Sequence, residues 1–161
     1  MAARHFYPIF LDISSRRAVV VGGGKVAYRK AAALVEAGAC VTAVAPDFDE
    51  RLRTLSLERV EREYREGDLE GAHLAFAATN QRAVNAQVAR EAKAHGIPVN
   101  IADAPAECDF IVPARIRRGG IQVAISTSGT NPSLAAEIRK RIEALLDDIL
   151  EKESPQHPAD N

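Results

Sequence analysis

The sequence predicts an α/β fold built on a mainly parallel sheet, and three observations support this prediction. The apolar run from Ala18 to Val21 is rich in β-branched residues, which indicates a strand buried on both faces. Three glycines at 22–24 follow it directly and lead into a pattern of helical spacing that Gly38 ends. Strand and helix patterns then alternate as far as residue 101. This alternation is typical of parallel strands joined by right-handed crossovers, so we expect a Rossmann-like sheet.

The remaining elements are predicted from their own start and stop signals. Strands are expected over 40–45, 60–64, 74–79 and 97–101, with 60–64 at a sheet edge, and helices over 47–55, with Asp47 as N-cap, and from Val84 to Gly96. The pattern then changes, because two apolar stretches at 110–116 and 121–126 flank Arg117-Arg118-Gly119-Gly120 and predict a hairpin. Pro132 suits the first position of a last, long helix.

Length and composition bound the organisation of the chain. With 161 residues we expect a domain over 1–109, a smaller segment over 110–153 and a flexible tail over 154–161. The net charge of −1 gives no general attraction to nucleic acid or to a membrane surface, and no apolar run approaches the length of a membrane span. Cys40 and Cys108 lie far apart and form no metal or disulfide pattern, so we expect a cytoplasmic protein.

The glycine string is the main functional signal. Gly22 allows the tight turn after the strand, Gly24 lets a pyrophosphate approach the backbone, and Ala27 is small enough for close helix–strand packing. Lys25 and Val26 then lie at the helix N-terminus, where free N–H groups attract anions. This context favours dinucleotide binding over a purely structural turn. A P-loop is excluded because Lys25 is followed by Val26 rather than by Ser or Thr.

Two carboxylates occupy positions where open α/β sheets bind ligands. Asp47 follows the second strand and either holds the ribose of a dinucleotide or only caps the next helix. The absence of an arginine in place of this acid favours NAD over NADP. Asp103 follows the strand that ends at Ile101, where it could accept a proton, although by spacing alone an Asp-Ala-Pro turn residue is the more frequent explanation.

The segment 126–132 leads from a strand into the last helix. The side chains and N–H groups of Ser126, Thr127 and Ser128 could hold a carboxylate or a phosphate, or they could only cap the helix. Arg115, with the arginines at 117 and 118, either forms an anion-binding patch or a solvated hairpin tip. The four histidines show no ligand spacing, so no metal site is predicted.

The chain resembles the precorrin-2 dehydrogenase family, the dehydrogenase module of sirohaem synthases. The resemblance runs from about residue 7 to residue 146, and its motifs are specific because they occur together and in order. They are the segments 7–11, 20–27, 29–30, 34–39, 44–46, 77–80 with Asn85, 100–103, 110–114 and 124–132.

This resemblance implies an activity and a set of site residues. It implies NAD-dependent oxidation of precorrin-2 to sirohydrochlorin, in some members with insertion of ferrous iron, and a homodimer that uses the hairpin and the last helix. The essential aspartate of the family falls on Asp103, which reverses the preference for a turn residue. The predicted cofactor-binding residues are Gly22, Gly24, Lys25, Val26, Pro46, Asp47 and Thr79, and the predicted substrate-binding residues are Arg115, Ser126, Thr127 and Ser128.

Two other functions compete with this one. An NAD-sensing regulatory domain would use the glycine string and the acid after the second strand, but would have no use for Asp103 or for the arginines of the hairpin. A chelatase with a vestigial nucleotide site would not bind NAD. NAD binding and conversion of precorrin-2 separate these possibilities.

Overall fold

The structure is a computed structural model, and it describes residues 5–153. The predicted tail over 154–161 lies outside the described residues. The chain divides into two compact units, a sheet unit of residues 7–111 and a hairpin unit of residues 1–6 and 112–161. In chain order the elements are β1 (Arg17–Val21), α1 (Lys25–Glu36), β2 (Cys40–Ala45), α2 (Glu50–Arg53), β3 (Glu58–Glu61), β4 (Leu74–Ala77), α3 (Arg82–Ala94), β5 (Val99–Ile101), the short 3-10 helix η1 (Pro105–Glu107), β6 (Ala114–Arg118), β7 (Ile121–Ile125) and α4 (Pro132–Glu153).

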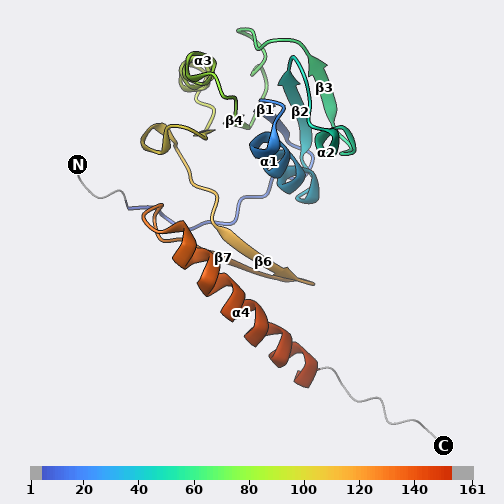
Figure 1. Cartoon of the computed structure of the whole chain (residues 1–161), viewed down its shortest axis with the longest axis vertical. Coiled ribbons are helices and arrows are strands. Elements are labelled where there is room, and N and C mark those ends of the chain that lie inside the picture. Colours follow the sequence, from blue (N-terminus) through green and yellow to red (C-terminus); the bar gives the residue numbers. More distant parts are fainter. Residues whose placement is uncertain (1–4, 154–161) are drawn as a thin grey trace, which may run out of the picture. The chain divides into compact units, whose positions relative to one another are not determined.

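The sheet unit confirms the predicted Rossmann-like fold. Its five strands are all parallel and lie in the order β3-β2-β1-β4-β5 (Figure 1). The chain leaves β1 toward β2 on one side and returns to β4 on the other, so the strand order reverses next to β1. The crevice outside the carboxyl ends of the strands at such a reversal is where open α/β sheets bind ligands.

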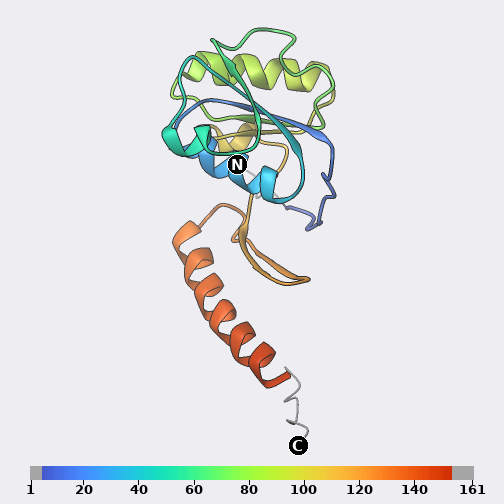
Figure 2. The ribbon, with the colours of Figure 1, turned by 90° about the vertical axis from the view of Figure 1, so that its right-hand side faces the viewer.

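Both faces of this sheet are covered by helices. Figure 2 shows α3 along one face and α1 with α2 along the other. Ala27, Ala31 and Leu34 of α1 pack with alternate residues of β1 on one side, whereas Val88 and Ala92 of α3 pack on the other. Two-sided burial explains why β1 reads as a continuous apolar run in the sequence, since neither of its faces meets water.

The predicted C-terminal cap of α1 is present, whereas the start of α2 and the end of β3 differ from the prediction. Gly38 follows α1 with a positive φ of 80°, and its N–H donates to Val35 while that of Ala39 donates to Leu34, which is the predicted glycine cap. Asp47 is not the N-cap of α2, because the helix begins two residues later than expected and Asp49 accepts from the N–H of Arg51. The edge strand ends at Glu61 rather than at residue 64, so that Tyr64 turns inward and is buried.

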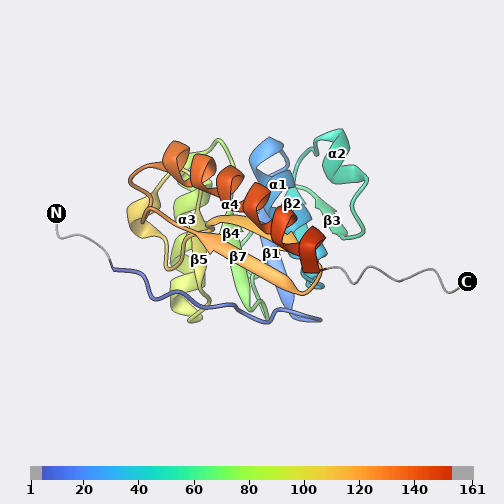
Figure 3. The same cartoon turned by 90° about the horizontal axis from the view of Figure 1, so that it is seen from below.

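The hairpin unit contains β6, β7 and α4, as the sequence predicts. The two strands are antiparallel, and α4 lies beside them (Figure 3). Arg118 at the end of β6 holds the helix, because its Nε lies 2.6 Å from Asp147 Oδ1 and its Nη2 lies 2.9 Å from Glu143 Oε1. Ile116 and Ala135 are buried within this unit. None of the described helices is long and apolar enough to cross a membrane.

Candidate functional site

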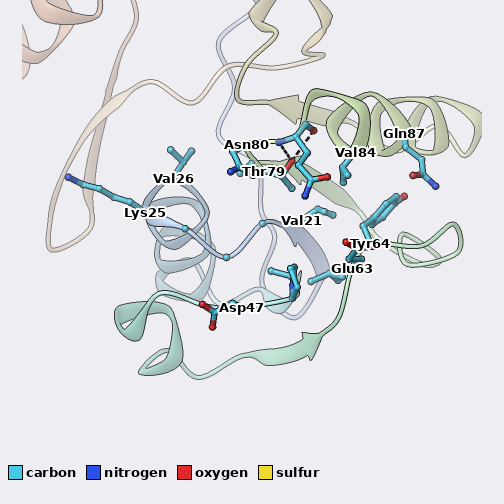
Figure 4. Close-up of a pocket in the computed structure, with 18 residues that line it drawn as sticks. Val21, Lys25, Val26, Asp47, Glu63, Tyr64, Thr79, Asn80, Val84 and Gln87 are labelled. Carbon is cyan, nitrogen blue, oxygen red and sulfur yellow. Dashed lines mark hydrogen bonds between the residues drawn. The ribbon is translucent and has the colours of Figure 1, made fainter.

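A pocket of about 560 Å³ opens at the carboxyl ends of β1, β2 and β4 in the sheet unit. Lys25 and Val26 lie beside the start of α1, whereas Tyr64, Val84 and Gln87 group on the α3 side (Figure 4). All seven residues that the sequence predicts as cofactor-binding line this pocket: Gly22, Gly24, Lys25, Val26, Pro46, Asp47 and Thr79. The topology thus brings together four loops that are distant in sequence.

The three glycines shape the floor of the pocket, each for a different reason. Gly22 has a φ of +131°, and a Cβ there would lie 2.4 Å from the carbonyl oxygen of Ala78. A Cβ at Gly23 would lie 1.8 Å from the carbonyl oxygen of Asp47, so any other residue here would force the backbone to shift. A Cβ at Gly24 would meet no protein atom within 4 Å, which leaves its backbone open to a ligand. The glycine string alone predicts roles for Gly22 and Gly24 but gives no signal for Gly23.

The N-terminus of α1 has the features of an anion-binding site. Its N-cap is Gly24, which has no side chain to occupy the free N–H groups, and its first turn contains no acidic residue. The partial positive charge of the helix start is therefore directed toward the pocket, with Lys25 beside it. These features fit the pyrophosphate of a dinucleotide.

Two acids, which follow β2 and β3, give their part of the pocket lining a negative character. Asp47 and Glu63 both line it, and the carboxylate of Asp47 is 88% exposed. Asp47 Oδ1 accepts from Arg53 Nη2 at 3.0 Å, while Arg53 Nη1 lies 2.8 Å from Glu61. Arg53 is therefore shared by two carboxylates. Because Asp49 rather than Asp47 caps α2, Asp47 remains available to a ligand.

The catalytic candidate, Asp103, lies next to this pocket rather than in its lining. It follows β5 by two residues, and its Oδ1 accepts from the side-chain amide of Asn85 at 2.9 Å. Arg82 Nη1 is 3.7 Å from the same oxygen. Asn85 also bonds to Thr79, which lines the pocket, so one side chain connects the carboxylate to the pocket wall.

The wall on the α3 side rests on a buried carboxylate that the sequence analysis missed. Glu91 accepts from the N–H groups of Gly67 and Leu69 and from the hydroxyl of Tyr64. Burial, together with the hydrogen bond to Glu91, raises the pKa of Tyr64. No local pattern marks Glu91, because its partners come from a loop more than twenty residues away.

The candidate substrate residues all belong to the hairpin unit. Ser126 Oγ accepts from Ser128 N at 3.0 Å, and Thr127 Oγ1 accepts from Asn131 N at 3.2 Å. Asn131 caps α4 by accepting from the N–H of Leu134 at 3.0 Å, so the capping alternative accounts for part of this segment. Arg118 is engaged by Glu143 and Asp147, which removes it from the expected anion patch.

Comparison with known proteins identifies the family. Residues 9–114 match the family described as "Putative NAD(P)-binding", and residues 118–145 match the family described as "Sirohaem biosynthesis protein central". A solved structure named SirC, precorrin-2 dehydrogenase, aligns with a TM-score of 0.76 at 30% identity, covering 87% of this chain and 71% of that chain. This chain belongs to the precorrin-2 dehydrogenase family.

Longer relatives within this family carry the same module. The siroheme synthase of Pseudomonas aeruginosa is 46% identical over 145 residues, and that of Methylococcus capsulatus is 46% identical over 152 residues. Each alignment covers 88% of this chain but 31% of the relative. The chain therefore spans about a third of the length of these siroheme synthases.

Proposed function

We propose that this chain is an NAD-dependent precorrin-2 dehydrogenase, which oxidises precorrin-2 to sirohydrochlorin in sirohaem biosynthesis. The observation that carries the proposal is the joint arrangement of a dinucleotide-type pocket and an adjacent carboxylate, Asp103, connected through Asn85. A regulatory NAD-sensing domain needs the pocket alone. Membership of the precorrin-2 dehydrogenase family supports the enzyme over the sensor.

The reaction removes a hydride and a proton from the macrocycle. Gly24 and the start of α1 would hold NAD, and the bound cofactor would supply the redox chemistry as the hydride acceptor. Asp103 accepts the proton, which makes it the general base. Asn85 Nδ2 and Arg82 Nη1 both approach Oδ1 of this carboxylate, at 2.9 Å and 3.7 Å.

The pocket favours NAD over NADP. The additional phosphate of NADP carries about two negative charges, which would face Asp47 and Glu63. Like charges at short range repel each other. Arg53 offers little compensation because Asp47 and Glu61 already neutralise it. Asp47 in turn can accept hydrogen bonds from the ribose hydroxyls.

The carboxylates of precorrin-2 need cationic partners and hydrogen-bond donors. Arg115 and the loop of Ser126, Thr127 and Ser128, which precedes α4, supply both chemistries within the hairpin unit. We also propose that the protein is a homodimer, as the resemblance to the family implies. Exposed apolar side chains on β7 and α4 support this: Ile121, Leu134, Leu145 and Ile149.

The decisive assay is anaerobic conversion of precorrin-2 with and without NAD. We expect NADH, followed by its absorbance, to form in step with sirohydrochlorin only in the complete mixture. NAD binding without conversion of precorrin-2 would favour the regulatory domain. A separate assay with Fe²⁺ and sirohydrochlorin, in which sirohaem is the product, tests the expected iron insertion. Failure to bind NAD would leave only the chelatase alternative.

A second assay tests the cofactor preference. Asp47→Ala is expected to weaken NAD binding about 10-fold, because it removes the charged acceptor of the hydrogen bonds that the ribose hydroxyls donate. The same change should improve NADP binding. Glu50→Gln, which removes an exposed carboxylate of α2 outside the pocket lining, is the matched control and should leave both affinities unchanged.

A further inference from the structure

Asn85 is the most completely bonded polar side chain of the site. It lies in the first turn of α3 and has no solvent exposure. Its Oδ1 accepts from the backbone N–H of Thr79 at 3.2 Å and from the hydroxyl of Thr79 at 2.8 Å. Its Nδ2 donates to the carbonyl of Thr79 at 3.1 Å and to Asp103 Oδ1 at 2.9 Å. All four hydrogen-bonding positions of the amide are therefore used.

These partners fix the orientation of the amide. A carboxylate can only accept hydrogen bonds, so the nitrogen must face Asp103, and the N–H of Thr79 can only donate, so the oxygen must face it. Rotating the amide by 180° would break bonds on both sides in a fully buried place, where an unpaired polar group is costly. The side chain thus has one arrangement.

We propose that Asn85 is a positioning residue, which holds the carboxylate of Asp103 at a fixed place beside the cofactor pocket. This inference rests on the proposed dehydrogenase function. Asn85 joins two segments, the β4–α3 loop that lines the pocket and the turn after β5 that carries Asp103. By donating to Oδ1 it fixes the position and the orientation of the carboxylate.

Arg82 is a weaker candidate for the same task. Its side chain is about half exposed, its Nη1 lies 3.7 Å from Asp103, and its Nη2 bonds to Glu107. This pairing lowers the pKa of Glu107 and shows that Arg82 is engaged mainly there. Asn85 is buried and closer to Asp103, so its hold on the carboxylate is the more rigid one.

The first experiment uses Asn85→Asp, which preserves the shape of the side chain. The variant still accepts both hydrogen bonds from Thr79 and loses only the one donated to the Thr79 carbonyl, so most of the contact with the pocket wall is kept and NAD binding should change little. It cannot donate to Asp103, and two carboxylates at contact cannot both stay ionised. We expect kcat for precorrin-2 to fall about 100-fold, in the range of a lost general base, with the Kd for NAD changed less than about 3-fold.

Asn100→Asp is the matched control. Asn100 is also buried, in β5, but its Oδ1 accepts from Lys30 Nζ at 2.6 Å, so a carboxylate there gains an ammonium partner. This variant should keep the wild-type kcat. A merely structural role for Asn85 would instead lower stability and NAD affinity together and leave the turnover of the bound complex unchanged.

The second experiment measures the contact without turnover. Melting temperatures are compared for Asn85→Ala, Asp103→Ala and the double variant. When two residues interact, the double variant lowers the melting temperature by less than the sum of the two single decreases. We expect this non-additivity for Asn85 and Asp103. Additive losses would overturn the inference, and so would wild-type kcat in Asn85→Asp.

The two experiments also separate this inference from the proposed function. If the wild-type chain fails to oxidise precorrin-2, the proposed function falls and the catalytic role of Asn85 falls with it, whatever the melting temperatures show. If the wild type is active and Asp103→Asn is not, while Asn85→Asp retains full kcat, only the inference about Asn85 fails.

Discussion

At the scale of single residues, the glycine corner separates what a sequence can predict from what it cannot. The roles of Gly22 and Gly24 are predicted from the strand–turn–helix context alone. The positive φ of Gly22 fits the predicted tight turn, and the pyrophosphate contact of Gly24 stays a prediction. Gly23 is constrained by the carbonyl of Asp47, which arrives from a loop after β2, and no local signal announces that contact. The family resemblance includes both Asp103 and Asn85 in its motifs, but only the folded chain shows the hydrogen bond between them.

Substitutions in this corner should separate folding from binding. Gly23→Ala is expected to destabilise the fold by about 1–3 kcal/mol, because its Cβ overlaps backbone that cannot easily move. Gly24→Ala should keep the wild-type melting temperature and weaken NAD binding, since its Cβ meets no protein atom and the residue lines the pocket. Thermal unfolding and NAD titration measure the two effects, with Gly120→Ala in the hairpin as control. Equal stability of the Gly23 and Gly24 variants would contradict this account.

At the scale of elements, α3 contributes most to the site. Its apolar face was predicted from Val84, Val88, Ala89 and Ala92, and the described helix confirms it. Its polar residues could not be assigned in advance, because buried Asn85 and Glu91 look like ordinary solvent-facing positions in the sequence. Only the folded chain shows that Asn85 holds Asp103 and that Glu91 supports Tyr64.

The Tyr64–Glu91 pair predicts a pH dependence of stability. The pKa of Tyr64 is raised in the folded chain, chiefly by burial, so above about pH 10 the unfolded chain releases the phenol proton while the folded chain keeps it. The folded state then binds more protons, and the free energy of unfolding falls as pH rises. In Tyr64→Phe this alkaline loss should be shallower, by at most about 1.4 kcal/mol per pH unit.

Urea unfolding over a series of alkaline pH values measures that difference. Tyr64→Phe should also be less stable at neutral pH by about 1–3 kcal/mol, because Glu91 loses one of its donors. Tyr7→Phe, which changes an exposed side chain, is the control and should retain the wild-type profile. An alkaline slope in Tyr64→Phe equal to that of the wild type would refute the linkage.

At the scale of the whole molecule, the pocket and its carboxylate lie entirely in the sheet unit, whereas the candidate substrate residues lie in the hairpin unit. This division predicts that cofactor binding survives changes in the hairpin unit. The order of strands and helices was predictable because each element has its own periodicity. The arrangement of the proposed dimer was not predictable, because the sequence of an apolar surface does not show which other surface packs against it.

Aspartate at Leu145 and Ile149 together should convert the proposed dimer into a monomer. Both side chains are exposed on α4, and an unpaired charge in a buried interface is costly. Light scattering after size exclusion measures the mass, and NAD affinity should stay at the wild-type value. Lys140→Asp, a charge change at an exposed position of the same helix, should remain dimeric. A monomeric wild type would rule out the proposed assembly.

The most direct measurement of the central claim compares Asp103→Asn with Glu107→Gln under anaerobic conditions with precorrin-2 and NAD. The asparagine still accepts from Asn85 but cannot take a proton, so we expect turnover to fall at least about 100-fold with NAD affinity unchanged. Glu107→Gln removes a neighbouring carboxylate that contacts Arg82 and should retain turnover. Wild-type turnover in Asp103→Asn would contradict the assignment of the base and, with it, the proposed mechanism.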